Sequence, residues 1–205
     1  MKKQEVFLKS NELNEFHNMT SLSEEILIKL HDHYRKFSAI KTDDGVIDYT
    51  EFCTLIGKTN TILTKRIFDT IDCNKDGFIN FREFIKFLSC FDTGSLEEQI
   101  QLSFSVMKDY SEKIIDAKSM KILLKESINY ENNLKIFFDD NTIDFIVDET
   151  FNKYIDKESE NIDYALYGKI VRENPEILIW FKIDFDNLKR VNIKQKIKKN
   201  ACFGK

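Results

Sequence analysis

One stretch of twelve residues constrains this chain more than any other, because oxygen-bearing side chains recur in it at alternate positions. Asp72, Asn74 and Asp76 occupy its first, third and fifth positions, and Glu83 occupies its twelfth. Clustered carboxylates repel one another unless a cation lies among them. A hard divalent cation such as Ca²⁺ takes six to eight oxygen ligands, so this spacing predicts a calcium-binding loop.

The other positions of this loop, which we call loop two, complete an EF-hand pattern. Gly77 stands where the backbone must bend sharply and tolerates positive φ. Phe78 offers its backbone carbonyl, and Asn80 is placed to hold a bridging water. Mg²⁺ suits the loop less well, because it needs strict octahedral geometry. An alternative interpretation is a loop that folds without metal. The predicted ligands are Asp72, Asn74, Asp76, Phe78, Asn80 and Glu83.

Loop two has degenerate copies along the chain. Four isoleucines occupy the corresponding position at intervals of 32, 36 and 47 residues, namely Ile47, Ile79, Ile115 and Ile162. Apolar residues flank each loop at steps of three and four, which is typical of amphipathic helices. With only 6 Gly and 1 Pro in 205 residues, the chain has little material for hairpins. We expect an all-α EF-hand fold with four helix-loop-helix units, paired into two lobes by short strands between the loops.

The predicted organisation follows from this repeat. Helices are expected about 22–37, 49–56, 62–71, 81–88, 96–107, 120–128, 143–151, 163–171 and 174–183, with a long connector about 129–140. The predicted domains are an N-terminal extension (1–20), a first EF-hand lobe (21–92), a degenerate second lobe (95–173), and a C-terminal helix with a basic tail (174–205).

Loop one, residues 38–51, departs from the pattern at its start. Counting back twelve positions from Glu51 places Ile40 first, where its side chain cannot coordinate a metal. Asp44 and Asp48 keep their places, so the loop is lengthened and Ser38 or backbone carbonyls would replace the missing carboxylate. Two interpretations stay open: a second calcium site formed by Ser38, Asp44, Asp48 and Glu51, or a loop that only braces loop two.

Loops three (108–119) and four (155–166) have lost most of their oxygen ligands. Lys108 and Ser119 stand at the first and twelfth positions of loop three, and Ile155 and Leu166 stand there in loop four. Too few oxygens remain to replace the hydration shell of an ion. We expect both loops to be metal-free and the second lobe to be insensitive to calcium.

Composition and motifs exclude several classes of function. A net charge of −4 and a pI near 5.5 give no reason to expect nucleic acid. No phosphate-binding Gly loop, nucleophile with a base, or acid/base carboxylate pair occurs outside the loops, so no enzyme is expected. The 4 scattered cysteines and the absence of a signal-like start indicate a reducing compartment, the cytoplasm.

The basic tail could contact anionic lipid or tubulin, with Cys202 as an acyl site, but a solvated end is favoured. The stripe Ile177, Leu178, Trp180 and Phe181 is expected to pack on the second lobe; the alternatives are that it plugs the protein's own groove or meets a partner.

The chain resembles the calcineurin B and calcineurin B-like calcium sensors, relatives of the neuronal calcium sensors. The resemblance lies in the 14-residue first loop with Asp43-Asp44-Gly45-Val46-Ile47, then Glu51-Phe52, Arg66-Ile67-Phe68-Asp69, 143–151 and Asn174-Pro175-Glu176-Ile177-Leu178. It implies a calcium-regulated subunit that holds a helix of a kinase or phosphatase in an apolar groove.

The 93–98 junction is also similar to calaxin-type axonemal EF-hand proteins. That likeness implies an alternative, a structural subunit of a cytoskeletal or ciliary assembly whose partner binding ignores calcium. In the sensor interpretation, calcium would reorient the helices of the first lobe. The reorientation would expose the aromatic side chains Phe68, Phe81, Phe84 and Phe87.

Overall fold

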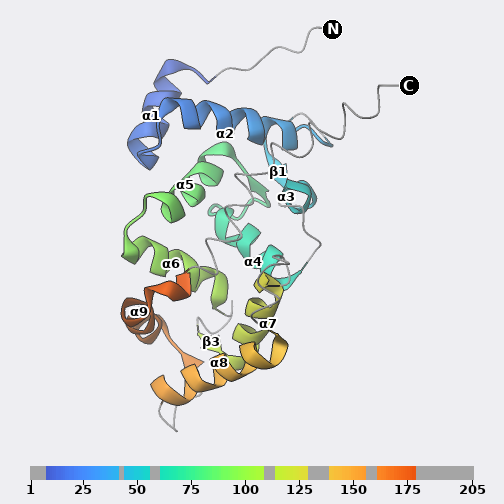
Figure 1. Cartoon of the computed structure of the whole chain (residues 1–205). Helices are drawn as coiled ribbons and strands as arrows, with labels where there is room; N and C mark the ends of the chain where they lie inside the picture. Colours follow the sequence, from blue (N-terminus) through green and yellow to red (C-terminus); the bar gives the residue numbers. More distant parts are fainter. Residues whose placement is uncertain are drawn as a thin grey trace, which may run out of the picture.

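A computed structural model describes residues 8–41, 44–55, 61–108, 114–128, 139–155 and 161–178 of the chain (Figure 1). The predicted connector, the basic tail, Trp180, Phe181 and Cys202 lie wholly or mostly outside these residues. The first half contains α1 (Ser10–Thr20), α2 (Glu24–Phe37), β1 (Ile47–Asp48), α3 (Tyr49–Leu55), α4 (Ile62–Ile71), β2 (Phe78–Ile79) and α5 (Phe81–Asp92). The second half contains α6 (Leu96–Met107), β3 (Ile115–Asp116), α7 (Ala117–Ile128), α8 (Asp140–Tyr154), β4 (Asn161–Ile162), α9 (Tyr164–Glu173) and the 3₁₀ turn η1 (Pro175–Leu178).

Two short antiparallel strand pairs organise these helices into two lobes. In the first pair, Ile47 of β1 lies opposite Ile79 of β2. In the second, Ile115 of β3 lies opposite Ile162 of β4. All four isoleucine side chains are buried, so each pair anchors the loops of its lobe to the core. The predicted fold class is therefore confirmed, including the pairing of loop one with loop two.

The helix boundaries follow the capping signals in the sequence. Ser95 accepts a hydrogen bond from the Glu98 amide at 3.3 Å, and the Glu98 carboxylate accepts one from the Ser95 amide at 2.7 Å. This capping box satisfies amides that the first turn of α6 leaves unpaired. Thr61 caps α4 in the same manner, accepting from the Thr64 amide at 3.1 Å. Local side-chain chemistry thus sets where the helices begin.

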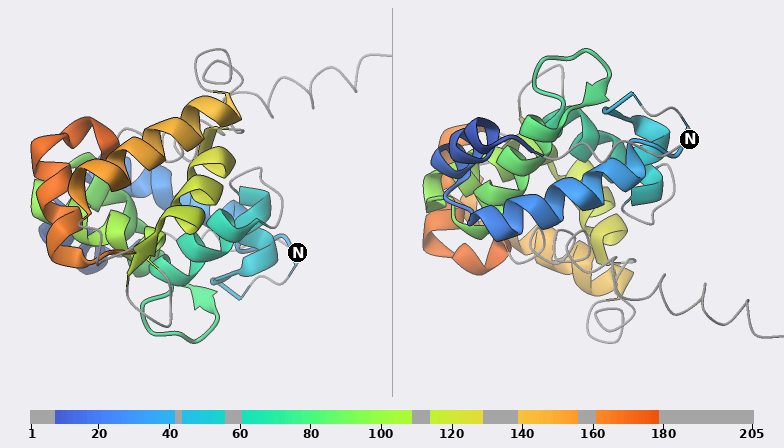
Figure 2. Two further views of the ribbon diagram at one scale, coloured as in Figure 1. Left: turned by 90° about the horizontal axis from the view of Figure 1, so that it is seen from below. Right: turned by 90° about the horizontal axis from the view of Figure 1, so that it is seen from above.

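Helix α1 lies within the stretch that the sequence predicts only as an extension. It packs across α2 and α5 at one end of the first lobe (Figure 2). The Phe16 ring meets the Phe81 ring edge-on at 5.4 Å between centroids, and Glu15 forms an ion pair with Arg82. The Thr93 hydroxyl donates to the Thr20 carbonyl at 3.2 Å. Tertiary contacts, rather than helix propensity, account for this helix.

The apolar core runs through both lobes, and aromatic rings fill much of the first. Phe68, Phe81, Phe84 and Phe87 are all buried, with Phe84 only 1% exposed. In this structure they are core residues, and their exposure on calcium binding stays a prediction. Leu178 of η1 is buried as well, which agrees with packing of the C-terminal stripe on the protein. Among the described residues, none of the helices combines the length and apolar character needed to cross a membrane.

Candidate metal centre in the first lobe

Loop two begins at the end of α4 and ends in the first turn of α5. Asp72 is the residue that follows α4, with φ −67° and ψ 81°, so its side chain leaves the helix toward the loop. Gly77 has a φ of +87°, the left-handed region that favours glycine, as its place in the motif predicts. Lys75 also has a positive φ, 62°. These turns curl the loop back toward α5.

The loop-two side chains bond to the backbone of the loop itself. Asn74 Oδ1 accepts from the Asp76 amide at 2.9 Å, and Asp76 Oδ1 accepts from the Phe78 amide at 2.8 Å. Asp72 Oδ2 accepts from the Gly77 amide at 3.0 Å. These bonds turn the ligand-bearing side chains at positions one, three and five inward across the same short loop.

Glu83 closes the loop from the opposite side, and only 8% of it is exposed. Its Oε1 accepts from the Cys73 and Asn74 amides at 3.2 and 3.4 Å. Its Oε2 accepts from the Asn80 amide at 3.0 Å, while Asn80 Oδ1 accepts from the Glu83 amide at 3.0 Å. The Cys73 and Asn74 amides therefore hold the predicted twelfth ligand against the first half of the loop, while a capping box with Asn80 fixes it at the start of α5.

One oxygen of loop two suits a cation particularly well. Asp72 is 3% exposed, and its Oδ1 is buried without a hydrogen-bond donor from the described residues. A buried carboxylate oxygen without a partner is costly, and a bound cation would satisfy it. No three Asp, Glu, His or Cys side chains within the described ranges already converge tightly enough to hold a metal. The donor set fits Ca²⁺, whose binding would draw these oxygens away from the backbone amides.

Loop one has a similar hydrogen-bond frame, but a lysine ammonium already lies against one of its carboxylates. Glu51, 3% exposed, accepts from the Lys41 amide at 3.0 Å and from the Asp48 amide at 3.1 Å. The Lys41 ammonium lies 2.6 Å from Asp48 Oδ2. Ser38 is fully buried, and its Oγ makes no hydrogen bond to the described chain. Asp44 Oδ1 accepts from the Val46 amide at 3.2 Å.

The Lys41 ammonium changes the electrostatics of loop one. Burial raises the pKa of Asp48, but hydrogen bonds from Lys41 and from the backbone of Glu51 and Thr50 outweigh it, so the pKa lies below the ordinary value. A Ca²⁺ ion in loop one would have to displace this ammonium. A calcium site on Ser38, Asp44, Asp48 and Glu51 stays a prediction, and the Lys41 ammonium is a competitor that such a site would have to overcome.

Tyr34 of α2 connects the two loops, a role that the sequence did not indicate. Its hydroxyl lies 2.9 Å from the Gly45 carbonyl of loop one and 2.7 Å from the Ile79 carbonyl of loop two. Burial and the nearby carboxylate of Glu83 raise the pKa of this phenol, so it stays a neutral donor. Nothing in the spacing of Tyr34 distinguishes it from other buried residues of an amphipathic helix.

In the second lobe, aspartates at the described ends of loops three and four accept hydrogen bonds from the first turns of the helices that follow. Asp116 accepts from the Ser119 amide at 2.8 Å, at the start of α7. Asp163 accepts from the Leu166 amide at 2.8 Å and caps α9. The central residues, 109–113 and 156–160, lie outside the described chain. That these loops bind no metal stays a prediction.

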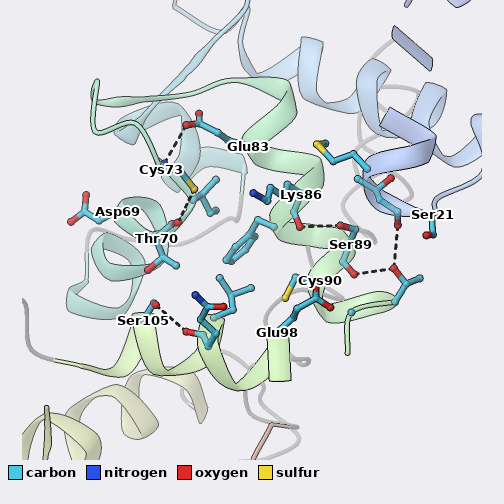
Figure 3. A pocket seen from close by; sticks show the side chains of 18 of the residues that line it. Ser21, Asp69, Thr70, Cys73, Glu83, Lys86, Ser89, Cys90, Glu98 and Ser105 are labelled. Carbon is cyan, nitrogen blue, oxygen red and sulfur yellow. Dashed lines mark hydrogen bonds between the residues drawn. The ribbon is translucent and has the colours of Figure 1, made fainter. Parts of the chain in front are cut away.

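A cavity of about 710 Å³ lies beside loop two, bounded by the ends of α1 and α4 and by the lengths of α5 and α6 (Figure 3). Glu83 and Cys73 line it on the loop side, and Phe87 of α5 and Leu102 of α6 contribute apolar surface. Lys86, Cys90 and Glu98 also line it. Glu83, a predicted calcium ligand, therefore forms part of the wall of this cavity.

Comparisons with known proteins agree with this geometry. Residues 63–91, which contain loop two and both of its helices, match the EF hand domain. The chain is similar to the calcineurin B protein of Yarrowia lipolytica, 33% identical over 118 residues. It is similar to the calcineurin B protein of Naegleria gruberi, 26% identical over 163 residues, and to calaxin of Homo sapiens, 30% identical over 122 residues.

The extent of these matches differs. They cover 57%, 79% and 60% of this chain, and 65%, 88% and 57% of the respective relatives. Residues 63–91 form an EF hand, and this match together with the calcineurin B likeness implies Ca²⁺ as the cofactor. The predicted likeness to the calcineurin B and neuronal calcium sensor group, with calaxin as the second group, is confirmed. The relatives are calcium-binding and regulatory proteins, not enzymes, as expected for this chain.

Proposed function

We propose that this protein is a cytoplasmic calcium sensor that binds Ca²⁺ in loop two and holds a helical segment of a partner protein. The ligands are the side chains of Asp72, Asn74, Asp76 and Glu83, the Phe78 carbonyl, and Asn80 through a water. Loop one fills at higher calcium, because Lys41 already lies on Asp48 at 2.6 Å. Similarity to two calcineurin B proteins supports a regulatory role.

The observation that carries the proposal is the buried Asp72 Oδ1, to which no residue in the described part of the chain donates a hydrogen bond. Bound Ca²⁺ supplies the positive charge that this oxygen and the other loop carboxylates lack. Glu83 can then exchange its bonds to the Cys73 and Asn74 amides for bidentate ligation. Because Glu83 lies in the first turn of α5, that exchange displaces α5 relative to α4.

The partner helix is proposed to enter through the cavity beside Glu83. Displacement of α5 would widen this cavity, would expose more of Phe87, which already lines it, and would bring the buried Phe84 toward it. An amphipathic helix could then insert apolar anchors between α5 and α6, the helix-in-groove mode of recognition. The partner would be a kinase, a phosphatase or a cytoskeletal subunit, as the resemblance implies.

Calorimetric calcium titration of the wild type, Asp72→Asn and a control, Asp69→Asn, tests the metal site. Asp72→Asn keeps the shape of the side chain but removes the negative charge of its carboxylate. It should therefore weaken calcium binding more than tenfold. Asp69 pairs with Lys65 outside the loop, so its variant should titrate like the wild type. Equal calcium affinity in all three proteins would refute the assignment.

A second function is favoured by the calaxin match, which covers 60% of this chain at 30% identity. In it, the protein is a fixed subunit of a cytoskeletal or ciliary assembly, and calcium only stabilises the fold. Affinity capture of partners with calcium and with chelator separates the two. A partner retained only with calcium supports the sensor, whereas one retained equally in both supports the structural subunit.

A further inference from the structure

Helix α4 belongs to the first lobe by sequence, but it is fastened to the second. It lies against α6 and α7 as well as against α3 and α5 (Figure 1). Two polar contacts cross between the lobes, one at its first turn and one a turn further on. The element that delivers Asp72 to loop two is therefore in contact with both lobes.

The first contact is made by Arg66, which is only 8% exposed. Its Nη1 donates to the Met107 carbonyl at 2.5 Å and to the Lys108 carbonyl at 3.1 Å. These carbonyls lie at the C-terminal end of α6, where the last turn of a helix leaves acceptors unpaired and the helix dipole favours a cation. A buried guanidinium thus caps the helix that leads into loop three.

The second contact is made by Glu126 of α7. Its Oε2 accepts from the Leu63 amide at 2.7 Å, at the N-terminal turn of α4. The amides of a first turn lack partners within the helix, and the dipole there favours a carboxylate. Arg66 and Glu126 therefore hold α4 from α6 and α7, each with charge matched to a helix end.

Helix α5 is held differently. It joins α6 through Thr93 and Gly94, whose amides both donate to the Ser89 carbonyl, at 2.8 and 3.1 Å. A Cβ on Gly94 would lie 2.2 Å from the Cys90 carbonyl oxygen, so the turn admits no side chain there. This tight link fixes one end of α5, while its other end carries Glu83 beside the cavity.

We propose that Arg66 and Glu126 are positioning residues that lock α4 to the second lobe, so that calcium binding in loop two moves α5 about the Thr93–Gly94 turn and reshapes the cavity. The inference rests on the proposed calcium site. It adds that α4, α6 and α7 respond as one body and that α5 is the moving part. Without the lock, α4 shares the displacement and the cavity responds less.

Spin-label distances measured with calcium and with chelator test the lock. The four native cysteines are replaced by Ser, and labels are placed on exposed Lys65 of α4 with Lys118 of α7, or on Lys86 of α5 with Gln101 of α6. A 12-residue helix rotating about one end should shift the α5–α6 distance by about 3–6 Å. The α4–α7 distance should stay unchanged in the wild type.

In Arg66→Met, which keeps an apolar stem but removes the donors, the α4–α7 distance should become calcium-dependent and the α5–α6 shift should shrink at least twofold. Glu126→Gln provides a second variant should Arg66→Met fold poorly. Arg172→Met removes an exposed guanidinium paired with Glu97 and should behave like the wild type.

Calorimetry on the same labelled proteins separates the outcomes. If the wild type binds calcium and its α4–α7 distance changes on binding, the lock alone is overturned. The lock alone is also overturned if calcium binds and both label distances are the same in the wild type, Arg66→Met and Glu126→Gln. Absence of calcium binding in the wild type would refute the proposed function and the lock together.

Discussion

Replacing Glu83 by Gln alters the charge of loop two while keeping the length of the side chain. In the structure, Glu83 accepts hydrogen bonds from three backbone amides, those of Cys73, Asn74 and Asn80. A glutamine has one acceptor oxygen, so either the Asn80 amide or the other two lose their partner. We expect the calcium-free protein to lose about 1–2 kcal/mol of unfolding free energy.

In addition to this loss, Glu83→Gln should lose the stabilisation that bound calcium gives to the wild type. A ligand present at 100 times its Kd stabilises a protein by about 2.7 kcal/mol. For a chain of this length, each kcal/mol shifts Tm by about 2–4 °C, so calcium should raise the Tm of the wild type by about 5–10 °C. Glu83→Gln cannot provide a bidentate carboxylate, and its Tm should rise by less than about 2 °C at the same calcium concentration.

Differential scanning calorimetry with calcium and with chelator measures both quantities. Glu149→Gln is the matched control, because Glu149 lies exposed on α8, away from loop two. It should keep the full calcium-dependent rise in Tm. The reasoning fails if Glu83→Gln shows the same rise as the wild type.

Three further changes test other parts of the structure. Gly77→Ala forces a Cβ into a φ of +87° with no atom within 4 Å, so the backbone alone should cost about 1–2 kcal/mol in urea unfolding. Tyr34→Phe removes the hydroxyl that joins the two loops and should cost about 1–2 kcal/mol in the same assay; no loss would show that the link is dispensable. Burial and, to a smaller extent, Glu98 raise the pKa of Cys90 to about 11, so at pH 8 iodoacetamide should modify Cys90 much more slowly than exposed Cys73. The stability that the neutral Cys90 thiol contributes is complete below about pH 8.5 and should fall as the pH rises toward about 11, a trend that Cys90→Ser should remove from pH-dependent unfolding.

The features that the sequence predicted are those governed by fixed spacing. Ile47 and Ile79 could be placed opposite each other because each occupies the same position in its loop, and the structure pairs them. The Ser95 capping box needs only residues three apart, and it forms as expected. Loop two has the predicted bend at Gly77, because the sixth position of the ligand pattern needs a positive φ that glycine adopts without steric cost.

The features that the sequence did not indicate depend on contacts between distant segments. Helix α1 is stabilised by Phe81 and Arg82, which lie more than sixty residues further along the chain. The ion pair between Lys41 and Asp48 lies in the lengthened first loop, to which the spacing rule of the twelve-residue loop does not apply. Arg66 was noted as part of a family-like segment, but its burial against the end of α6 follows only from the packing of the lobes.

The ammonium that Lys41 places on Asp48 also shapes how the protein would report a calcium signal. Two hands joined through Ile47 and Ile79 have the connection needed for cooperative filling. If one hand first has to release its own cation, the two fill at separate concentrations, and the steepness that paired sites provide is lost. The response would then be graded, spreading over a wider range of free calcium instead of switching within a narrow one.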